Sequence, residues 1–417
     1  MVIGIYGIAS QSGRAFLADY LSQGYRVIGY NRPSVHGNLV IDSIRKGNGL
    51  YLERPENTNK EVSKFLTLGD SCVTTDLEYM VLNSDIVIVA LPSIYQEEAV
   101  QNMCDAGIWK KRTPIVLSPS RSVATPYLWR IVGERYPIVC FSTCPYSCKA
   151  PKPDVAYIKR RKRTWIASLE GDFNLVQIEF VKRLFPQAAL STVPALTSLN
   201  NIGAVFHCAT YLLNYDEIEK RKNNGEVFSF YIDGIASRPE VGHVLEEIDQ
   251  VRLHIAAALG IDVFGLKENP REDVWRKLTN GLRALEAEHD NEIEILRNIR
   301  KQFLEYLNNS VLSAQHWLDI TYGVVRIEGE SLSQAIGRTP TYQKNSVPQL
   351  RYIEEDIPTG LVAFEALAKM LGVDCQIVTD MIDLYDSIRQ DNIRKKGRNL
   401  LDFTKDYILN YLRGELK

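Results

Sequence analysis

Arg351 and Asp356 stand five positions apart near the end of the chain, within the segment Arg-Tyr-Ile-Glu-Glu-Asp-Ile-Pro-Thr-Gly at 351–360. A planar guanidinium suits a substrate carboxylate, which it can hold through two parallel hydrogen bonds. A carboxylate that precedes a Pro/Gly break and an apolar helical run can orient an imidazole. Taken alone, the segment is better explained as an acidic helix cap with a surface arginine, so its chemistry depends on what else the chain offers.

His207 is the candidate imidazole. It lies in the apolar stretch 200–214, where a lone histidine is more often a satisfied core residue than a functional one. Asn201 is off the helical face of His207 but can stand at the helix start and hydrogen-bond a ligand. Tyr231, in the aromatic segment 228–234, is another substrate-binding candidate. With the arginine and aspartate above, and with the nucleotide-type strand and glycine turn that open the chain, these residues suggest a reductase whose substrate carries carboxylates.

The beginning of the chain predicts a dinucleotide-binding fold. Residues 2–7 are a short apolar strand, residues 12–21 have helical spacing of apolar side chains, and residues 25–30 are the next strand. In such a β-α-β opening, a glycine turn lets the backbone approach a pyrophosphate at the helix N-terminus.

The glycine turn itself runs from Gly7 to Gly13. It departs from a clean GxGxxG pattern, because its central positions carry Ile8, Ala9 and Ser10. The motif is weak by itself, and its support comes from its placement between the flanking strands.

The end of the second strand indicates the cofactor. NAD-specific sites place an acid there to bind the ribose hydroxyls. This chain has no acid but Asn31, Arg32 and, after a proline, Ser34. A 2′-phosphate would find a guanidinium in Arg32 and donors in the other two, so the pattern favours NADPH. A surface arginine after a strand is the alternative.

Two more apolar runs, 85–91 and 114–118, predict parallel strands buried on both faces. Each ends in a Pro/Ser loop, and Leu91 and Pro92 are expected to contact the cofactor across the strand ends. Residues 136–142 predict a further strand, which leads into a loop at 144–149.

The composition excludes several classes of protein. A chain of 417 residues with 45 % hydrophobic residues can bury a large core and predicts two domains. The net charge of −2 argues against general nucleic-acid binding. No apolar run is long enough for a membrane span, and the first strand leaves no room for a signal peptide. We therefore expect a cytoplasmic protein.

The seven cysteines are expected to be free thiols in a reducing compartment. Cys144 and Cys148 have no second cysteine pair nearby, so no metal site is expected. The basic cluster 159–163 resembles a nuclear-localisation signal, but it lies between two short β-type runs and is better explained as a solvated hairpin turn.

The second half of the chain is helical. Residues 241–259, 361–371 and 376–388 have apolar side chains at three- and four-residue spacing. The charged segment 269–301 predicts a solvated helix or helical insert. The predicted fold class is therefore α/β plus all-α: a Rossmann-type doubly wound parallel sheet over residues 1–195 and an all-helical domain over residues 196–417.

These features, in this order, resemble the opine dehydrogenase family, which includes octopine and nopaline dehydrogenases, and within it the branch that makes opine-type metallophores such as staphylopine. The resemblance covers nearly the whole chain and includes Phe-Ser-Thr at 141–143, the series Asn201, His207 and Asn214, and Arg351 before Glu-Asp at 355–356. It implies an enzyme that reductively joins an amino acid to a 2-oxo acid, commonly pyruvate, with NAD(P)H.

Carried over residue by residue, the resemblance makes His207 the catalytic histidine and Asp356 its partner. Arg351 would bind a substrate carboxylate, and Arg32 would bind the NADP phosphate. The chain departs from the family in its glycine-poor turn. It also has Ser147 where the metallophore branch has an acid, which leaves the amino substrate open. We further expect a homodimer.

Two other functions remain open. A hydroxy-acid or polyol-phosphate dehydrogenase shares the fold, but often has a lysine near the active-site helix start, and residues 200–214 hold none. A non-catalytic NADP-binding sensor would be marked by loss of the His/Asp pair, and both residues are present.

Overall fold

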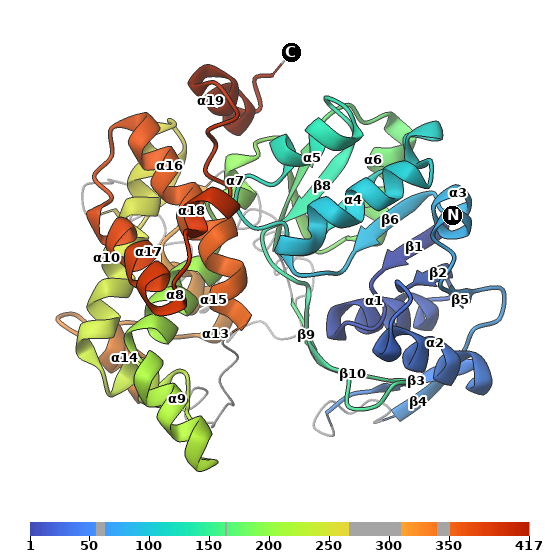
Figure 1. Cartoon of the computed structure of the whole chain (residues 1–417), viewed down its shortest axis with the longest axis horizontal. Helices are drawn as coiled ribbons and strands as arrows, with labels where there is room; N and C mark the ends of the chain where they lie inside the picture. Colours follow the sequence, from blue (N-terminus) through green and yellow to red (C-terminus); the bar gives the residue numbers. More distant parts are fainter. Residues whose placement is uncertain (56–62, 163–164, 267–309, 340–350, 417) are drawn as a thin grey trace, which may run out of the picture. The chain divides into compact units, whose positions relative to one another are not determined.

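The computed structural model describes residues 1–55, 63–162, 165–266, 310–339 and 351–416, with the side chains of residues 320, 321 and 351 left out. The chain divides into two compact units, Met1–Thr197 and Ser198–Lys417. The first is built on a sheet and the second on helices, as the labelled elements of Figure 1 show. This arrangement confirms the predicted α/β plus all-α fold class.

An eight-stranded sheet forms the centre of the first unit. Across the sheet the strands are β12 (Ala188–Ser191), β11 (Trp165–Glu170), β8 (Ile138–Phe141), β7 (Ile115–Leu117), β6 (Ile86–Val89), β1 (Val2–Tyr6), β2 (Arg26–Tyr30) and β5 (Cys72–Thr74). The strands from β8 to β5 are mutually parallel, while β11 is antiparallel to β8. Strands such as β6, which reads Ile-Val-Ile-Val, are buried along their whole length, as expected of parallel strands covered on both faces.

Helix α1 (Gln11–Ser22) packs on this sheet and also on a second, four-stranded sheet. The second sheet has the order β4 (Ser63–Thr67), β3 (Gly49–Glu53), β10 (Val155–Arg161) and β9 (Tyr146–Lys149). Asp19 of α1 accepts hydrogen bonds from the Tyr146 hydroxyl, at 2.6 Å, and from Arg161. These bonds join the helix that follows the glycine turn to the second sheet.

The second sheet corrects two sequence predictions. Residues 146–149, expected as a loop, form β9. The basic residues 159–161, expected in a hairpin turn, lie inside β10, because Arg160 and Arg161 pair with Ser147 and Tyr146 of β9. β10 and β11 belong to different sheets and do not form a hairpin. A run of basic residues favours a solvated turn when it is judged locally, and pairing with a distant strand leaves no local signal in the sequence. Residues 163 and 164 lie outside the described residues.

Further helices complete the first unit. They are α2 (Val35–Gly47), α3 (Leu77–Asn83), α4 (Gln96–Asp105), α5 (Thr125–Val132), α6 (Leu175–Leu184) and α7 (Ala195–Ser198), with short 3-10 turns at η1 (Ser93–Tyr95) and η2 (Ile108–Lys110). None of the seven cysteines, all within the described ranges, is in a disulfide.

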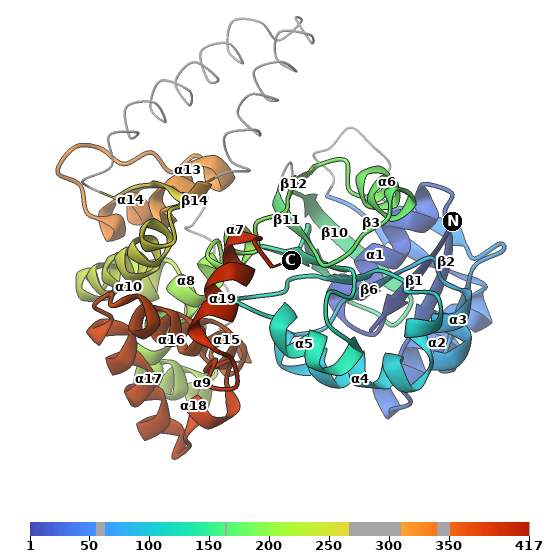
Figure 2. The ribbon, with the colours of Figure 1, turned by 90° about the horizontal axis from the view of Figure 1, so that it is seen from above.

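The second unit is arranged around α8 (Ile202–Leu213), which is apolar on nearly every side and packs on several helices (Figure 2). The other described elements are α9 (Tyr215–Asn224), η3 (Ile232–Ala236), α10 (Pro239–Ala258), β13 (Asp262–Phe264), β14 (Ser310–Leu312), α13 (Ala314–Tyr322), α14 (Leu332–Arg338), α15 (Arg351–Asp356), η5 (Ile357–Leu361), α16 (Val362–Leu371), α17 (Gln376–Arg389), α18 (Ile393–Lys396) and α19 (Lys405–Arg413). The predicted insert at 269–301 lies outside the described residues.

The predicted Pro/Gly break after Asp356 is absent. The chain continues from α15 into α16 through the π-turn η5, which holds both Pro358 and Gly360. Proline lacks a backbone N–H and cannot make a regular helical hydrogen bond, and a wider π-turn accommodates that defect without ending the helix. The sequence pattern therefore marked an irregular turn inside a helical run.

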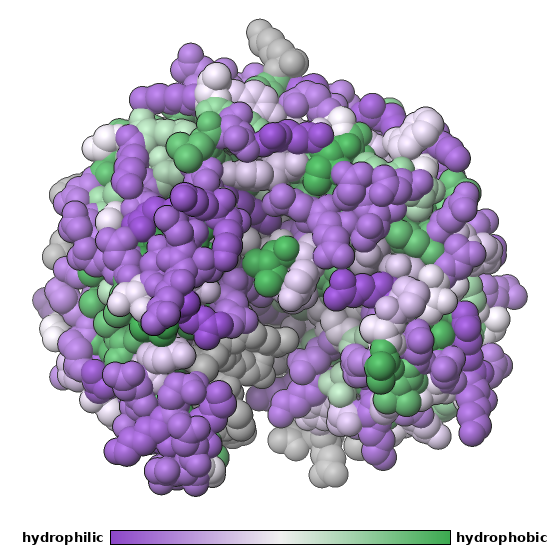
Figure 3. Space-filling view, viewed as in Figure 1, coloured by the Kyte–Doolittle hydropathy of each residue, from purple (hydrophilic) through white to green (hydrophobic). Residues whose placement is uncertain are grey.

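On the face drawn in Figure 3, hydrophobic residues form small groups among hydrophilic ones. Scattered apolar side chains of this kind are normal on protein surfaces. Among the described helices, none combines the length and the apolar character needed to cross a bilayer.

Candidate active site

His207 and Asp356 meet although they are 149 residues apart in sequence. His207 lies within α8, Asp356 is the last residue of α15, and these two helices pack on each other. Nδ1 of the imidazole is 2.7 Å from Oδ2 of the carboxylate. The Asp356 side chain is fully buried, whereas that of His207 is 26 % exposed. A carboxylate accepts the Nδ1 proton, so the neutral imidazole carries its lone pair on Nε2.

Two π-turns flank this pair. Asp356 directly precedes η5, and Tyr231 directly precedes η3. Each turn packs closely on α8 through a glycine: a β-carbon on Gly360 would lie 2.6 Å from Ala204 Cβ, and one on Gly234 would lie 2.7 Å from Thr210 Cγ2. π-turns are rare and are frequent at functional sites. Here they bring the residues that precede them close to the helix that carries the imidazole.

Aromatic side chains surround the imidazole. The ring of Tyr352 stacks on that of His207, with centroids 4.4 Å apart and an interplanar angle of 22°. Phe230 approaches the imidazole edge-on at 5.8 Å, and Tyr211 lies one turn along α8 at 6.4 Å. Sequence reasoning missed Tyr352, although it stands four residues before Asp356 and therefore on the same helical face.

The structure describes the other candidate residues of the second unit to different extents. Tyr231 hydrogen-bonds Tyr322, and its burial raises the pKa of its phenol, so it stays protonated. Asn201 stands at the start of α8 but is only 1 % exposed, and its amide faces the position where Gly360 lacks a β-carbon. The side chain of Arg351 lies outside the described residues. Glu355, the carboxylate next to Asp356 in the sequence, is not the one that the His207 ring contacts through Nδ1.

The glycine turn of the first unit has the geometry of a dinucleotide site. Gly7 has a φ of +98°, and a β-carbon there would lie 2.6 Å from a methyl carbon of Leu91. A β-carbon on Gly13 would lie 2.2 Å from the Gly7 carbonyl oxygen. Both positions therefore require glycine, one for its backbone conformation and one for close packing of helix on strand. The backbone N–H groups of Gly7 and Ile8 donate to the Tyr30 carbonyl at 2.8 and 3.2 Å.

Side chains hold the part of the turn that lacks glycine. The Asn31 side chain accepts from Ala9 N–H at 3.1 Å. Ser10 donates to the Ala90 carbonyl at 2.8 Å and caps α1 by accepting from Gly13 N–H. Buried Arg14 donates to the Ala9 carbonyl at 2.9 Å, and also to that of Ile8. Side-chain hydrogen bonds thus hold the backbone of the turn at the positions where it lacks glycine.

The candidates for the adenosine end lie around the end of β2. Arg32 forms an ion pair with Glu98 of α4 at 3.3 Å, and both side chains are more than half exposed. The Ser34 hydroxyl caps α2 by accepting from Gly37 N–H at 2.9 Å. Leu91 and Pro92 follow β6, and Pro92 precedes η1. These residues, with the two glycines and the capped start of α1, fit a dinucleotide with its pyrophosphate at the helix N-terminus.

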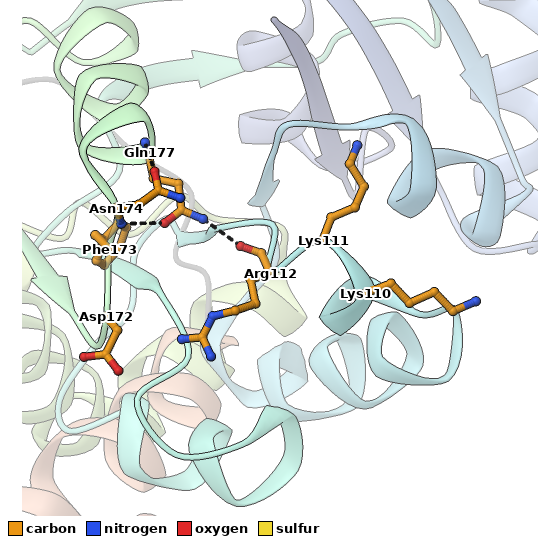
Figure 4. Close-up of a pocket in the computed structure, with 7 residues that line it drawn as sticks. All are labelled: Lys110, Lys111, Arg112, Asp172, Phe173, Asn174 and Gln177. Carbon is orange, nitrogen blue, oxygen red and sulfur yellow. Dashed lines mark hydrogen bonds between the residues drawn. The ribbon is translucent and has the colours of Figure 1, made fainter.

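A surface pocket of about 520 Å³ lies elsewhere in the first unit. Its lining residues are Lys110, Lys111, Arg112, Asp172, Phe173, Asn174 and Gln177. Figure 4 shows Lys110 and Lys111 extending away from the Asn174–Gln177 side. The pocket lies at the amino end of β7, whereas the glycine turn follows the carboxyl end of the parallel β1. It is therefore not part of the candidate site.

The sequence is similar to known enzymes. A family model described as NAD/NADP octopine/nopaline dehydrogenase, alpha-helical domain, matches residues 194–389. An opine dehydrogenase from Arthrobacter sp. (strain 1C) is 23 % identical over 342 residues, which cover 80 % of this chain and 79 % of that one.

Solved structures share the fold over the whole chain. Octopine dehydrogenase with NADH and L-arginine has a TM-score of 0.68 at 16 % identity, covering 98 % of each chain. Yersinopine dehydrogenase with NADP+ has a TM-score of 0.60 at 15 % identity, covering 100 % of this chain and 98 % of that one. At these identities the structures support the fold, and both were solved with nicotinamide dinucleotides.

Proposed function

Because this chain belongs to the opine dehydrogenase family, we propose that it joins an amino acid, or an amine derived from one, to a 2-oxo acid such as pyruvate, using NADPH. It is an NAD(P)-dependent oxidoreductase that acts on CH–NH groups. The observation that carries the proposal is the 2.7 Å contact between His207 and the buried Asp356 within the family's helical domain.

The chemistry needs a proton carrier. A primary amine condenses with a 2-oxo acid to an imine and water, and reduction of the imine gives a secondary amine between two carboxylates. The bound nicotinamide supplies the hydride. In our proposal, Nε2 of His207 takes a proton from the attacking amine and gives one to the leaving hydroxyl or the forming amine. Asp356 keeps the proton on Nδ1 in the neutral ring and stabilises the imidazolium when Nε2 is protonated.

Burial of the aspartate strengthens this effect. A fully buried carboxylate has lost its water shell, so its attraction to a cation on the neighbouring ring is poorly screened. The ring itself is partly exposed, which leaves Nε2 open to a substrate. Tyr352 stacks on one face of the ring and restricts its rotation. Arg351, at the start of the same helix, is assigned to a substrate carboxylate.

NADPH remains the proposed cofactor although Glu98 lies beside Arg32. An exposed ion pair of this kind is worth about 0–1 kcal/mol. A guanidinium contact with a phosphate is a charge-assisted hydrogen bond worth about 1.5–3 kcal/mol. A 2′-phosphate therefore displaces Glu98 from Arg32, with Asn31 and the start of α2 nearby.

Two narrower parts of the proposal concern the product and the assembly. A secondary amine flanked by carboxylates offers nitrogen and oxygen ligands, so the product is proposed as a metallophore. The enzyme is proposed as a homodimer. Metal titration of the purified product and light scattering of the protein test these two parts separately.

The test of the function is a matrix of 2-oxo acids and amino acids, including nicotianamine-like amines, in which NADPH oxidation is followed and products are identified by mass. We expect oxidation only when both partners are present, with a product mass equal to the two substrates minus water plus two hydrogens. Oxidation with an oxo or hydroxy-acid substrate alone would favour a hydroxy-acid dehydrogenase, and NADPH binding without turnover on any pair would favour a sensor.

A further inference from the structure

The ammonium group of Lys162 lies beside loops at the carboxyl edge of the parallel sheet. It follows β10 directly, and its backbone N–H donates to the Pro145 carbonyl at 2.8 Å. Its ammonium donates to the hydroxyl of Thr143, which lies just beyond the carboxyl end of β8. The lysine is partly buried, unlike Lys159 three residues earlier, which is exposed.

The electrostatic surroundings of Lys162 are positive. Within the described part of the chain, no carboxylate lies within ion-pair distance of its ammonium. The groups that act on it are the Cys144 thiol and the guanidinium groups of Arg160 and Arg121. Burial lowers the pKa of Lys162 to about 8; the thiol opposes this, and the two arginines add to it. A partly buried ammonium among cations is unfavourable unless an anion joins it.

The loop after β7, which carries Arg121, is strained. Arg121 and Val123 have φ values of +62° and +50°. A β-branched residue in this region is an outlier, and such strain collects at functional sites. Ser120 ties the loop to the neighbouring strand, since its backbone N–H donates to the Phe141 carbonyl at 3.1 Å. The loops after β7 and β8 are thus held side by side.

The position of these loops indicates which ligand they meet. The strand order reverses between β1 and β6, and the glycine turn that follows β1 is where a pyrophosphate binds. With a 2′-phosphate on Arg32, as proposed above, the adenosine half would lie beyond β2, on one side of that point. The nicotinamide half would then lie on the other side, over β6, β7 and β8. The carbon that accepts the hydride comes from the 2-oxo acid and is bonded directly to its carboxylate.

We propose that Lys162, with Thr143 and Arg121, binds the carboxylate of the 2-oxo acid. The proposal rests on the function proposed above. A 2-oxo acid carries a single negative charge, so a cationic cluster attracts it. An amino acid carries an ammonium beside its carboxylate, and the same cluster repels that group.

The test is a titration of pyruvate, and separately of 2-oxoglutarate, into NADPH-loaded enzyme without an amine, followed by NADPH fluorescence. A charge-assisted hydrogen bond corresponds to about a 10- to 100-fold change in affinity. Lys162→Met should weaken 2-oxo acid binding by that factor and leave NADPH binding unchanged. Lys159→Met, which removes an exposed lysine of the preceding strand β10, should match the wild type.

The pH dependence gives a second readout. The carboxylate of the ligand stays ionised throughout, so above pH 8 the wild type should lose affinity roughly tenfold per unit as Lys162 loses its proton. Lys162→Arg keeps its charge and should bind the 2-oxo acid without this loss up to pH 10. A decline of equal slope in the arginine variant would contradict the proposal.

Thermal unfolding separates binding from folding. Because Lys162 has no carboxylate partner among the described residues, Lys162→Met should unfold at the same temperature as the wild type or higher. The proposal fails if the wild type binds neither acid. It also fails if Lys162→Met binds both acids as the wild type does; if that variant still turns over, the proposed function stands without the Lys162 site. Binding that depends on Lys162 in a protein that condenses no amine would support the cluster and refute the function.

Discussion

The glycine turn of the first unit and the His207–Asp356 pair of the second are held in place by opposite means. In the turn, side-chain hydrogen bonds fix the positions that lack glycine: Asn31 accepts from the Ala9 N–H, and Arg14 donates to the carbonyls of Ile8 and Ala9. Around the pair, glycines allow two π-turns to pack directly on α8. A glycine motif that departs from the GxGxxG pattern can therefore still have a fixed backbone. A Pro/Gly segment whose sequence predicts the end of a helix can instead provide a surface for close helix packing.

This comparison predicts where each site is sensitive. The glycine turn should tolerate no side chain at Gly13, where a β-carbon would meet backbone atoms. The His207–Asp356 pair should tolerate none at Gly360, where a β-carbon would meet Ala204. Damage to one site should leave the function of the other intact. The predictions below test that separation.

Gly360→Ala should give the largest effect among the substitutions that test this separation. The added β-carbon lies 2.6 Å from Ala204, so η5 has to move and Asp356 moves with it. A displacement of about 1 Å at a catalytic group can cost about 100-fold in rate. We expect a fall in kcat of that order with an unchanged NADPH dissociation constant. The matched control is Gly47→Ala, where no atom lies within 4 Å of the new carbon. A loss of NADPH affinity in Gly360→Ala would contradict the separation.

Gly13→Ala should weaken NADPH binding about 10- to 100-fold, because overpacking against the Gly7 carbonyl costs about 1–3 kcal/mol. Fluorescence titration measures the effect, and the rate at saturating NADPH should stay near that of the wild type. An unchanged dissociation constant would mean that the turn does not contact the cofactor.

Arg32→Ala should lower kcat/KM for NADPH about tenfold or more and leave that for NADH nearly unchanged, since only NADPH carries the 2′-phosphate. Steady-state kinetics with both cofactors provide the measurement. Equal use of the two cofactors by the wild type would refute the NADPH preference.

Glu98→Gln should have the smallest effect and the opposite sign. It removes an exposed carboxylate that competes with phosphate for Arg32, a contact worth less than about 1 kcal/mol. NADPH affinity should rise by up to about fivefold, and more at low salt than at high salt. Weaker NADPH binding would show instead that Glu98 positions the guanidinium.

The sequence was sufficient where a structural pattern is local. The apolar runs of β6 and β7 predicted buried parallel strands, and the spacing in 241–259 predicted α10. Sequence-based prediction failed where pairing between distant residues determines the secondary structure. The basic residues of β10 are an example, because the sequence of their partner strand β9 predicted a loop. Family resemblance paired His207 with Asp356, but the stacking of Tyr352 and the Arg32–Glu98 contact arise only when distant elements pack together.

The most direct test of the central claim is a double-mutant cycle on His207 and Asp356, measured as single-turnover rates with saturating NADPH. His207→Ala and Asp356→Asn should each slow the reaction by about 10²- to 10⁴-fold, as expected for loss of acid–base help. If the two residues act as one unit, the double mutant should be little slower than the slower single mutant, and all three should bind NADPH as the wild type does. Rate losses that multiply in the double mutant would contradict the account, because they would show that the two residues act independently.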